Sequence, residues 1–151
     1  MKKSITTLSA AVLASMMLAS CGSDGYRDGT YRAEAVRYDD HGWKEYLVLT
    51  VKDGAITQAE FDAVNAEGVK KTEDADYEQA YLDADLGTWP ADTAQRLEEA
   101  LISTQKADEV DTVAGATWSS NSFRKLAAAL EKPMEKGSRE IVTVDLSDSD
   151  S

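Results

Sequence analysis

Apolar and polar residues alternate along three consecutive stretches of the chain, at residues 30–37, 43–51 and 55–63. In the second stretch, Leu47, Leu49 and Val51 recur at every second position. A period of two residues is typical of a strand with one buried face. Asp53-Gly54, between the second and third stretches, favours a tight hairpin turn because such a turn needs positive φ angles. The pattern therefore predicts an antiparallel meander of three strands, with one face buried and the other exposed to solvent.

Two later segments show the period of an amphipathic helix. Trp89-Pro90 predicts the start of the first helix, which reaches about Gln105 and carries its apolar stripe on Ala94, Leu97, Ala100 and Leu101. The second covers residues 119–132, with its stripe on Phe123, Leu126, Ala127 and Leu130, and Pro133 is expected to end it. A short helix over residues 77–84 and a last strand over residues 140–146 complete the prediction. The fold class is α+β, an antiparallel sheet meander packed with two main helices in a single small domain.

The first 20 residues read as an export signal. Lys2 and Lys3 precede an apolar stretch at residues 8–18, which suits a signal peptide and is shorter than the roughly 20 residues of a membrane-spanning helix. Leu18-Ala19-Ser20-Cys21 resembles the bacterial lipobox, which implies acylation of Cys21; an ordinary signal peptide ending near a cysteine is the alternative. We expect residues 1–20 to be the lipoprotein signal, 21–28 a lipid-anchored tether, 29–146 the domain and 147–151 an acidic tail. The protein would be held on the cell membrane or outer membrane, outside the cytoplasm.

Composition narrows the chemistry that the chain can perform. It has 28 Asp and Glu residues against 16 Lys and Arg residues, two of which are in the leader, so nucleic acid is not an expected partner. The one cysteine is assigned to the lipid, and the one histidine, His41, lies among turn-forming residues. No zinc site of the His-pair kind can form, and the acids at residues 73–76 lack calcium-loop spacing, so we expect no metal site. Redox chemistry would therefore need a bound cofactor.

A small-residue segment between the two main helices is the best candidate for chemistry. Gly115 permits close backbone approach or a positive φ, and Ser119 or Ser120 suits the N-cap of the helix that follows. The unpaired N–H groups of a helix start favour a phosphate, and Thr117 would place a hydroxyl beside it. An ordinary turn before a capped helix is the alternative.

The segment Asp111-Thr112-Val113-Ala114-Gly115-Ala116-Thr117 resembles the attachment motif of the FMN-binding domain family, which includes the FMN-carrying subunits of sodium-pumping quinone reductases and Rnf-type complexes. The resemblance implies that a flavin transferase, using FAD and magnesium, places FMN through its phosphate on Thr117, with Asp111, Gly115 and Ala116 matching the surrounding motif. Ala114 departs from the family, which usually has Ser or Thr there. Further fragments at residues 28–31, 42–44, 74–77 and 119–124 are similar to small lipoproteins described as major membrane immunogens.

The resemblance implies an electron carrier that is the substrate of a flavin transferase and not a stand-alone enzyme, with no catalytic residues. The expected cofactor is FMN, covalently attached, and the expected partners are the transferase, a membrane redox partner and the membrane itself. The expected contacts to FMN come from Thr117, Asp111, Gly115, Ala116, Trp118, Ser119, Ser120 and Lys71. Trp118 could stack on the flavin or instead fasten the helix to the sheet, and Lys71 could contact a phosphate or a reduced flavin or belong to a solvated loop. Noncovalent FMN binding and a surface lipoprotein without cofactor are the alternative functions.

Overall fold

The computed structural model of the chain describes residues 25–85 and 88–147, so the signal peptide, Cys21 and most of the acidic tail lie outside the described residues. Its strands are β1 (Gly29–Ala35), β2 (Lys44–Lys52), β3 (Ala55–Val64) and β4 (Val142–Val144). The α-helices are α1 (Ala75–Asp83), α2 (Pro90–Thr104) and α3 (Thr117–Lys136), and two single 3₁₀ turns are η1 (Lys71–Glu73) and η2 (Ala107–Glu109). The predicted α+β class is confirmed.

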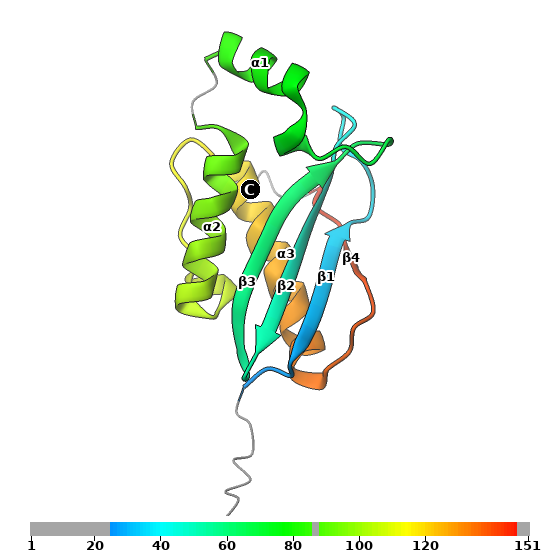
Figure 1. Ribbon diagram of the computed structural model, residues 1–151, viewed down its shortest axis with the longest axis vertical. Coiled ribbons are helices and arrows are strands. Elements are labelled where there is room, and N and C mark those ends of the chain that lie inside the picture. The colour runs from blue at the N-terminus through cyan, green and yellow to red at the C-terminus, as the bar shows by residue number, and fades with distance from the viewer. Residues whose placement is uncertain (1–24, 86–87, 148–151) are drawn as a thin grey trace, which may run out of the picture.

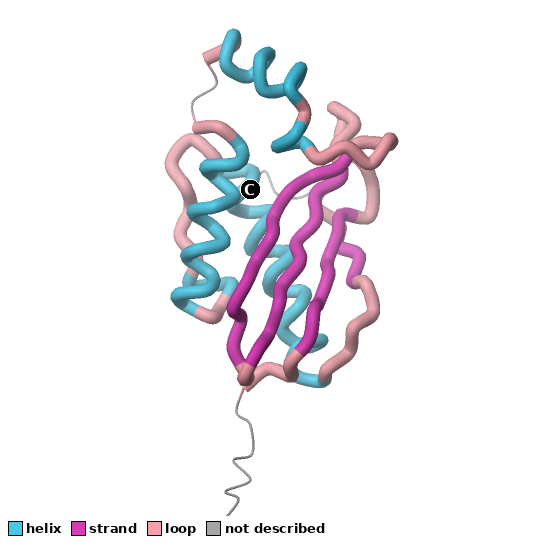
Figure 2. The backbone as a smooth tube through the Cα atoms, viewed as in Figure 1, coloured by secondary structure: helices cyan, strands magenta, loops and turns pink. Residues whose placement is uncertain are grey.

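One four-stranded sheet, in the order β3-β2-β1-β4, carries the two long helices on a single face (Figure 1). The meander of β1, β2 and β3 is antiparallel as predicted, and β4 adds to the edge of β1 in parallel. Leu47 lies opposite Ala33 on one side and Phe61 on the other, and all three are buried beneath the helices. Figure 2 shows the same two layers, with α1 standing apart beyond one end of the sheet.

The hairpin between β2 and β3 forms at Asp53 and Gly54, whose φ angles of 53° and 81° are both positive, as the Asp-Gly pair predicts. The beginning of the described chain is fastened to this end of the sheet. Tyr26 N donates to Gly54 O at 3.0 Å, and Arg27 N donates to Met134 O at 2.8 Å. The chain therefore enters the domain at the β2–β3 turn, at the opposite end of the sheet from the β1–β2 connection.

Helix α3 is longer than predicted at both ends. It begins at Thr117, not at Ser119, and it runs past Pro133 to Lys136, where Gly137 adopts a left-handed φ of 74°. Pro133 removes one N–H from the helix ladder, yet Met134 in the following turn is 1% exposed and belongs to the core. Burial of Met134 and the Gly137 cap outweigh the lost hydrogen bond, so the prediction that Pro133 ends the helix is wrong.

Candidate functional site

A tight turn leads into α3 at the segment that the sequence marks for chemistry. Ala116 N donates to Val113 O at 3.0 Å, and Gly115, inside the turn, has a φ of 78°. A Cβ on Gly115 would meet no atom within 4 Å, so the positive φ and not the available space calls for glycine here. The turn brings Thr117 to the first position of the helix with its side chain exposed.

Ser120 holds this turn against the helix. Its hydroxyl is fully buried, accepts from Val113 N at 3.0 Å and donates to Ala116 O at 2.7 Å. Ser119 and Ser120 therefore do not occupy the predicted N-cap position, because Ala116 precedes the helix and Ser120 bonds backward from its first turn. The exposed Ala114 makes none of these hydrogen bonds, so the turn closes without the hydroxyl that the family usually has at this position.

The start of α3 has no side-chain cap among the described residues, so the N–H groups of its first turn are available to a ligand. Gly115, Ala116, Thr117, Trp118 and Ser119 line a pocket of about 200 Å³, which we call the attachment pocket. Helix N–H groups and the positive end of the helix dipole favour an anion here. Of the predicted contact residues, this pocket brings together all except Asp111 and Ser120.

Asp111 and Ser120 lie outside the lining of the attachment pocket. Asp111 is exposed on the connector before the turn. The Arg124 guanidinium fixes that connector, since Nη1 donates to Val110 O at 3.0 Å and to Thr112 Oγ1 at 3.1 Å. Ser120 supports the pocket indirectly, because its hydroxyl closes the turn that precedes Thr117.

Lys71 enters the same pocket from η1, which begins more than 40 positions earlier in the chain. Its Nζ lies 4.9 Å from the centre of the Tyr77 ring and 5.7 Å from the centre of the Trp43 ring. No described carboxylate forms an ion pair with Lys71. A cation held over aromatic faces, without a carboxylate partner, is able to pair with a bound anion.

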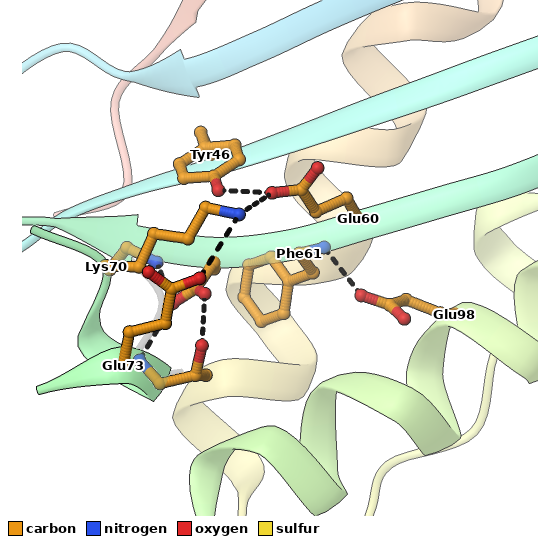
Figure 3. A network of polar contacts seen from close by, with 9 residues as sticks. Tyr46, Glu60, Phe61, Lys70, Glu73 and Glu98 are labelled. Atoms are coloured by element: carbon orange, nitrogen blue, oxygen red, sulfur yellow. Dashed lines mark hydrogen bonds and ion pairs between the residues drawn. The ribbon is translucent and has the colours of Figure 1, made fainter. Parts of the chain in front are cut away.

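The neighbouring Lys70 anchors the loop that carries Lys71 (Figure 3). Lys70 Nζ contacts Glu60 Oε1 at 2.8 Å, and the Tyr46 hydroxyl donates to the same oxygen at 2.6 Å. The pKa of Glu60 is lowered by the hydrogen bonds from Lys70 and Tyr46, and that of Lys70 is raised by Glu60. The two lysines thus have different roles, Lys70 in an ion pair on the sheet and Lys71 in the pocket.

Tyr77 and Tyr81, which the sequence did not assign to the site, line the attachment pocket and pack on two tryptophans. The Tyr77 ring packs at 5.5 Å from Trp43 and 6.0 Å from Trp89, and Tyr81 lies 5.4 Å from Trp89. Helix α1 has no buried residue and is attached to the domain through these rings. The available signal was the spacing of Tyr77 and Tyr81, four residues apart and so on one helix face, followed by an aromatic residue before Pro90.

Glu45 is a carboxyl group on the inner face of the sheet, in line with Leu47, Leu49 and Val51. It is partly buried and lines the attachment pocket. Burial raises the pKa of Glu45 to about 7, an increase that the Ser122 hydroxyl and the charge of Lys71 partly offset while Asp39 adds to it. The Ser122 hydroxyl is itself fully buried, and its approach to Glu45 falls outside standard hydrogen-bond geometry. The strand pattern had predicted no acid at the site.

Trp118 lines both the attachment pocket and a second hollow of about 330 Å³, and Glu45 likewise lines both. The indole is 38% exposed. A ring this exposed is not part of the sheet core, and contact of Trp118 with a flavin stays a prediction.

The sequence profile of the FMN-binding domain matches residues 41–130, a range that contains Glu45, Lys71 and Thr117. The chain belongs to the FMN-binding domain family. It is 35% identical over 132 residues to the 15 kDa lipoprotein of Treponema pallidum (strain Nichols), covering 87% of this chain and 93% of that one. The resemblance to small lipoproteins is therefore confirmed.

The fold is shared with a solved protein of comparable size. A crystal structure of a Clostridium perfringens protein matches with a TM-score of 0.72 and 41% sequence identity, over 80% of this chain and 98% of that chain. The chain is thus an FMN-binding-domain protein related to a lipoprotein. Within the described residues, none of the helices combines the length and the apolar character needed to cross a membrane.

Proposed function

We propose that this chain is a lipid-anchored, extracytoplasmic electron carrier that holds FMN as a phosphoester on Thr117. The observation that supports it best is the exposed Thr117 hydroxyl at the uncapped start of α3, where a closed turn presents it beside available N–H groups. A phosphate at this point would meet hydrogen-bond donors and the positive end of the helix dipole.

The other groups of the attachment pocket fit the rest of an FMN. Lys71 offers a positive charge, and Tyr77 and Tyr81 offer aromatic surface. Thr93 lines the pocket as well, is 2% exposed, and has a hydroxyl without a hydrogen-bond partner in the described chain. A buried hydroxyl without a partner costs about 1 to 3 kcal/mol, which a polar ligand atom could recover.

Attachment would exchange one phosphate bond for another. The Thr117 oxygen would bond to the flavin-side phosphorus of FAD, AMP would leave with the bridging oxygen, and the hydroxyl proton would pass to the transferase. Bound flavin supplies the hydride and electron chemistry that no side chain of this domain offers. The domain's own residues would bind and orient the flavin: the start of α3 would hold the phosphate, Lys71 would favour negative charge, and Trp118 would offer its ring to the flavin.

Anchoring is the second part of the proposal. Cys21 lies four residues before Gly25, a stretch that spans at most about 14 Å when fully extended. A carrier held so close to a membrane would meet its partners at a high local concentration. The relationship to a lipoprotein over 87% of the chain supports this assignment.

The experiment is expression of the full chain with and without a flavin transferase, followed by intact mass and visible absorption. We expect a yellow product, heavier by one FMN less one water, only with the transferase. Thr117→Ala should abolish the gain in mass, whereas the matched Ser119→Ala, which removes a hydroxyl from the same helix turn, should retain it. Flavin that leaves under denaturant would support noncovalent binding instead, and a colourless product would contradict both.

A further inference from the structure

The second hollow opens on the face of the domain that carries the β1–β2 connection, and exposed apolar side chains gather around it. Six large apolar side chains are strongly exposed in the described chain, and three of them, Val36, Tyr38 and Trp118, line this hollow. Their exposed fractions are 51%, 47% and 38%. Apolar groups gathered in one place on a protein surface mark an interaction site more often than scattered ones do.

Acidic side chains surround these apolar groups. Asp39, Asp40 and Asp145 line the same hollow, and the one basic residue in its lining, Arg37, forms an ion pair with Asp145 at 3.2 Å. We call the set of Val36, Tyr38, Trp118, Asp39, Asp40 and Asp145 the sheet-end patch. An apolar centre with a charged rim is the usual composition of a transient protein interface, and this rim is negative.

The patch lies at the opposite end of the sheet from the point where the described chain enters the domain. The chain enters at the β2–β3 turn, where Tyr26 binds Gly54. Strand β2 separates that turn from the β1–β2 connection, and its nine residues span about 27 Å. With a lipid on Cys21, as proposed above, four positions before Gly25, the β2–β3 end of the sheet would lie toward the membrane and the patch would face the aqueous space.

We propose that the sheet-end patch is the docking surface for a water-exposed redox protein whose own apolar contact area is rimmed by Lys and Arg. This proposal rests on the proposed function, because Trp118 belongs to both the patch and the attachment pocket and so brings a docked partner next to the flavin site. The negative rim steers a basic partner, and a protein buried in the plane of the anchoring membrane would not reach the patch.

The test uses mitochondrial c-type cytochrome as the probe, since it is a basic haem protein that accepts one electron. The dissociation constant is measured by calorimetry for the full lipidated chain in detergent, both loaded with flavin and unloaded, at several salt concentrations. The double variant Asp39→Asn/Asp40→Asn should weaken binding about fivefold at low salt and flatten its salt dependence. Asparagine keeps the oxygen with which Asp39 accepts from the backbone N–H groups of His41 and Trp43, so the turn is retained.

The matched control is Asp108→Asn/Glu109→Gln, which removes the same charge from η2. This turn follows Gln105, which bonds to Tyr26 and Ile56 near the lipid-proximal end. The control should change binding about twofold or less, and Val36→Ser/Tyr38→Ser should weaken it without changing the salt slope. Equal dissociation constants for patch and control variants would overturn the docking proposal even if flavin is loaded. If a chain that cannot be loaded with flavin still binds the cytochrome through the patch, the proposed function is overturned and the docking proposal is not.

Discussion

Lys71 Nζ lies 4.9 Å from the centre of the Tyr77 ring, in the pocket that Thr117 also lines, although Lys71 and Thr117 are 46 positions apart in the chain. The lysine has no ion-pair partner among the described carboxylates, whereas its neighbour Lys70 is paired with Glu60. This arrangement separates a lysine that holds the loop in place from one that can act on a ligand.

Replacing Lys71 with Gln in the flavin-loaded chain should lower the flavin midpoint potential by about 20 to 40 mV. The reduced flavin is anionic near neutral pH, so loss of a nearby positive charge disfavours reduction by about 1 to 2 kcal/mol. Spectroelectrochemical titration measures the shift, and Lys71→Arg should retain the original potential. An unchanged potential in a fully loaded Lys71→Gln chain would remove Lys71 from the site.

Removing the Ser120 hydroxyl should destabilise the domain by about 1 to 3 kcal/mol, because the partly buried Val113 N–H then loses its hydrogen-bond partner. Chemical denaturation of Ser120→Ala against the wild type gives the value. The comparison variant is Ser103→Ala on an exposed position of α2, which should stay within about 0.5 kcal/mol of the wild type. A Ser120→Ala chain of normal stability would mean that the turn closes by backbone contacts alone.

Glu45 should make stability depend on pH near neutrality. Its pKa rises from 4.5 in the unfolded chain to about 7 in the fold, so the folded chain binds more protons between these values and stability falls as pH increases across the window. Glu45→Gln should match the wild type near pH 5 and exceed it by about 1 to 3 kcal/mol at pH 8. Denaturant titrations at the two pH values test this.

The exposed Glu67 provides the control for Glu45, since Glu67→Gln should leave the pH dependence of the wild type in place. If Glu45→Gln and the wild type lose stability in parallel between pH 5 and pH 8, another group carries the titration.

Tyr77→Ala should release α1 from the domain without unfolding the sheet, because this helix has no buried residue and is attached through aromatic contacts. Hydrogen exchange followed by mass spectrometry should show about tenfold faster exchange at residues 75–83 and little change in the strands. Leu82→Ala removes a side chain that is 60% exposed on the same helix and should leave exchange unchanged. Equal protection of α1 in both variants would show that the aromatic contacts do not hold it.

Local patterns predicted the elements that bury one apolar face. The meander was predictable from the alternation along β2 and β3 and from the Asp53-Gly54 turn. Every second residue of a strand points to the same face of the sheet, so an apolar residue at every second position marks the core face. The end of α3 was not predictable in this way. Pro133 is a local stop signal, and its effect is reversed by the burial of Met134, which depends on contacts with the rest of the fold.

The candidate site likewise combines residues that a local motif identifies with residues that only the fold brings together. Thr117 and its turn are contiguous in sequence, so a local motif identified them. Tyr77 and Tyr81 come from α1 and Glu45 comes from β2, and only the fold brings them into the pocket that Thr117 lines. Ser120 was identified as a cap from residue type alone, and its actual role in closing the turn depends on where the helix begins.

The central claim is that FMN is bonded to one hydroxyl, that of Thr117. The most direct measurement is fragmentation mass spectrometry of peptides from the full chain coexpressed with a flavin transferase. The account predicts a single modified peptide with the flavin phosphate on Thr117. Modification of Thr112 or Ser119 in its place, or no modified peptide from a chain exposed to active transferase, would contradict it.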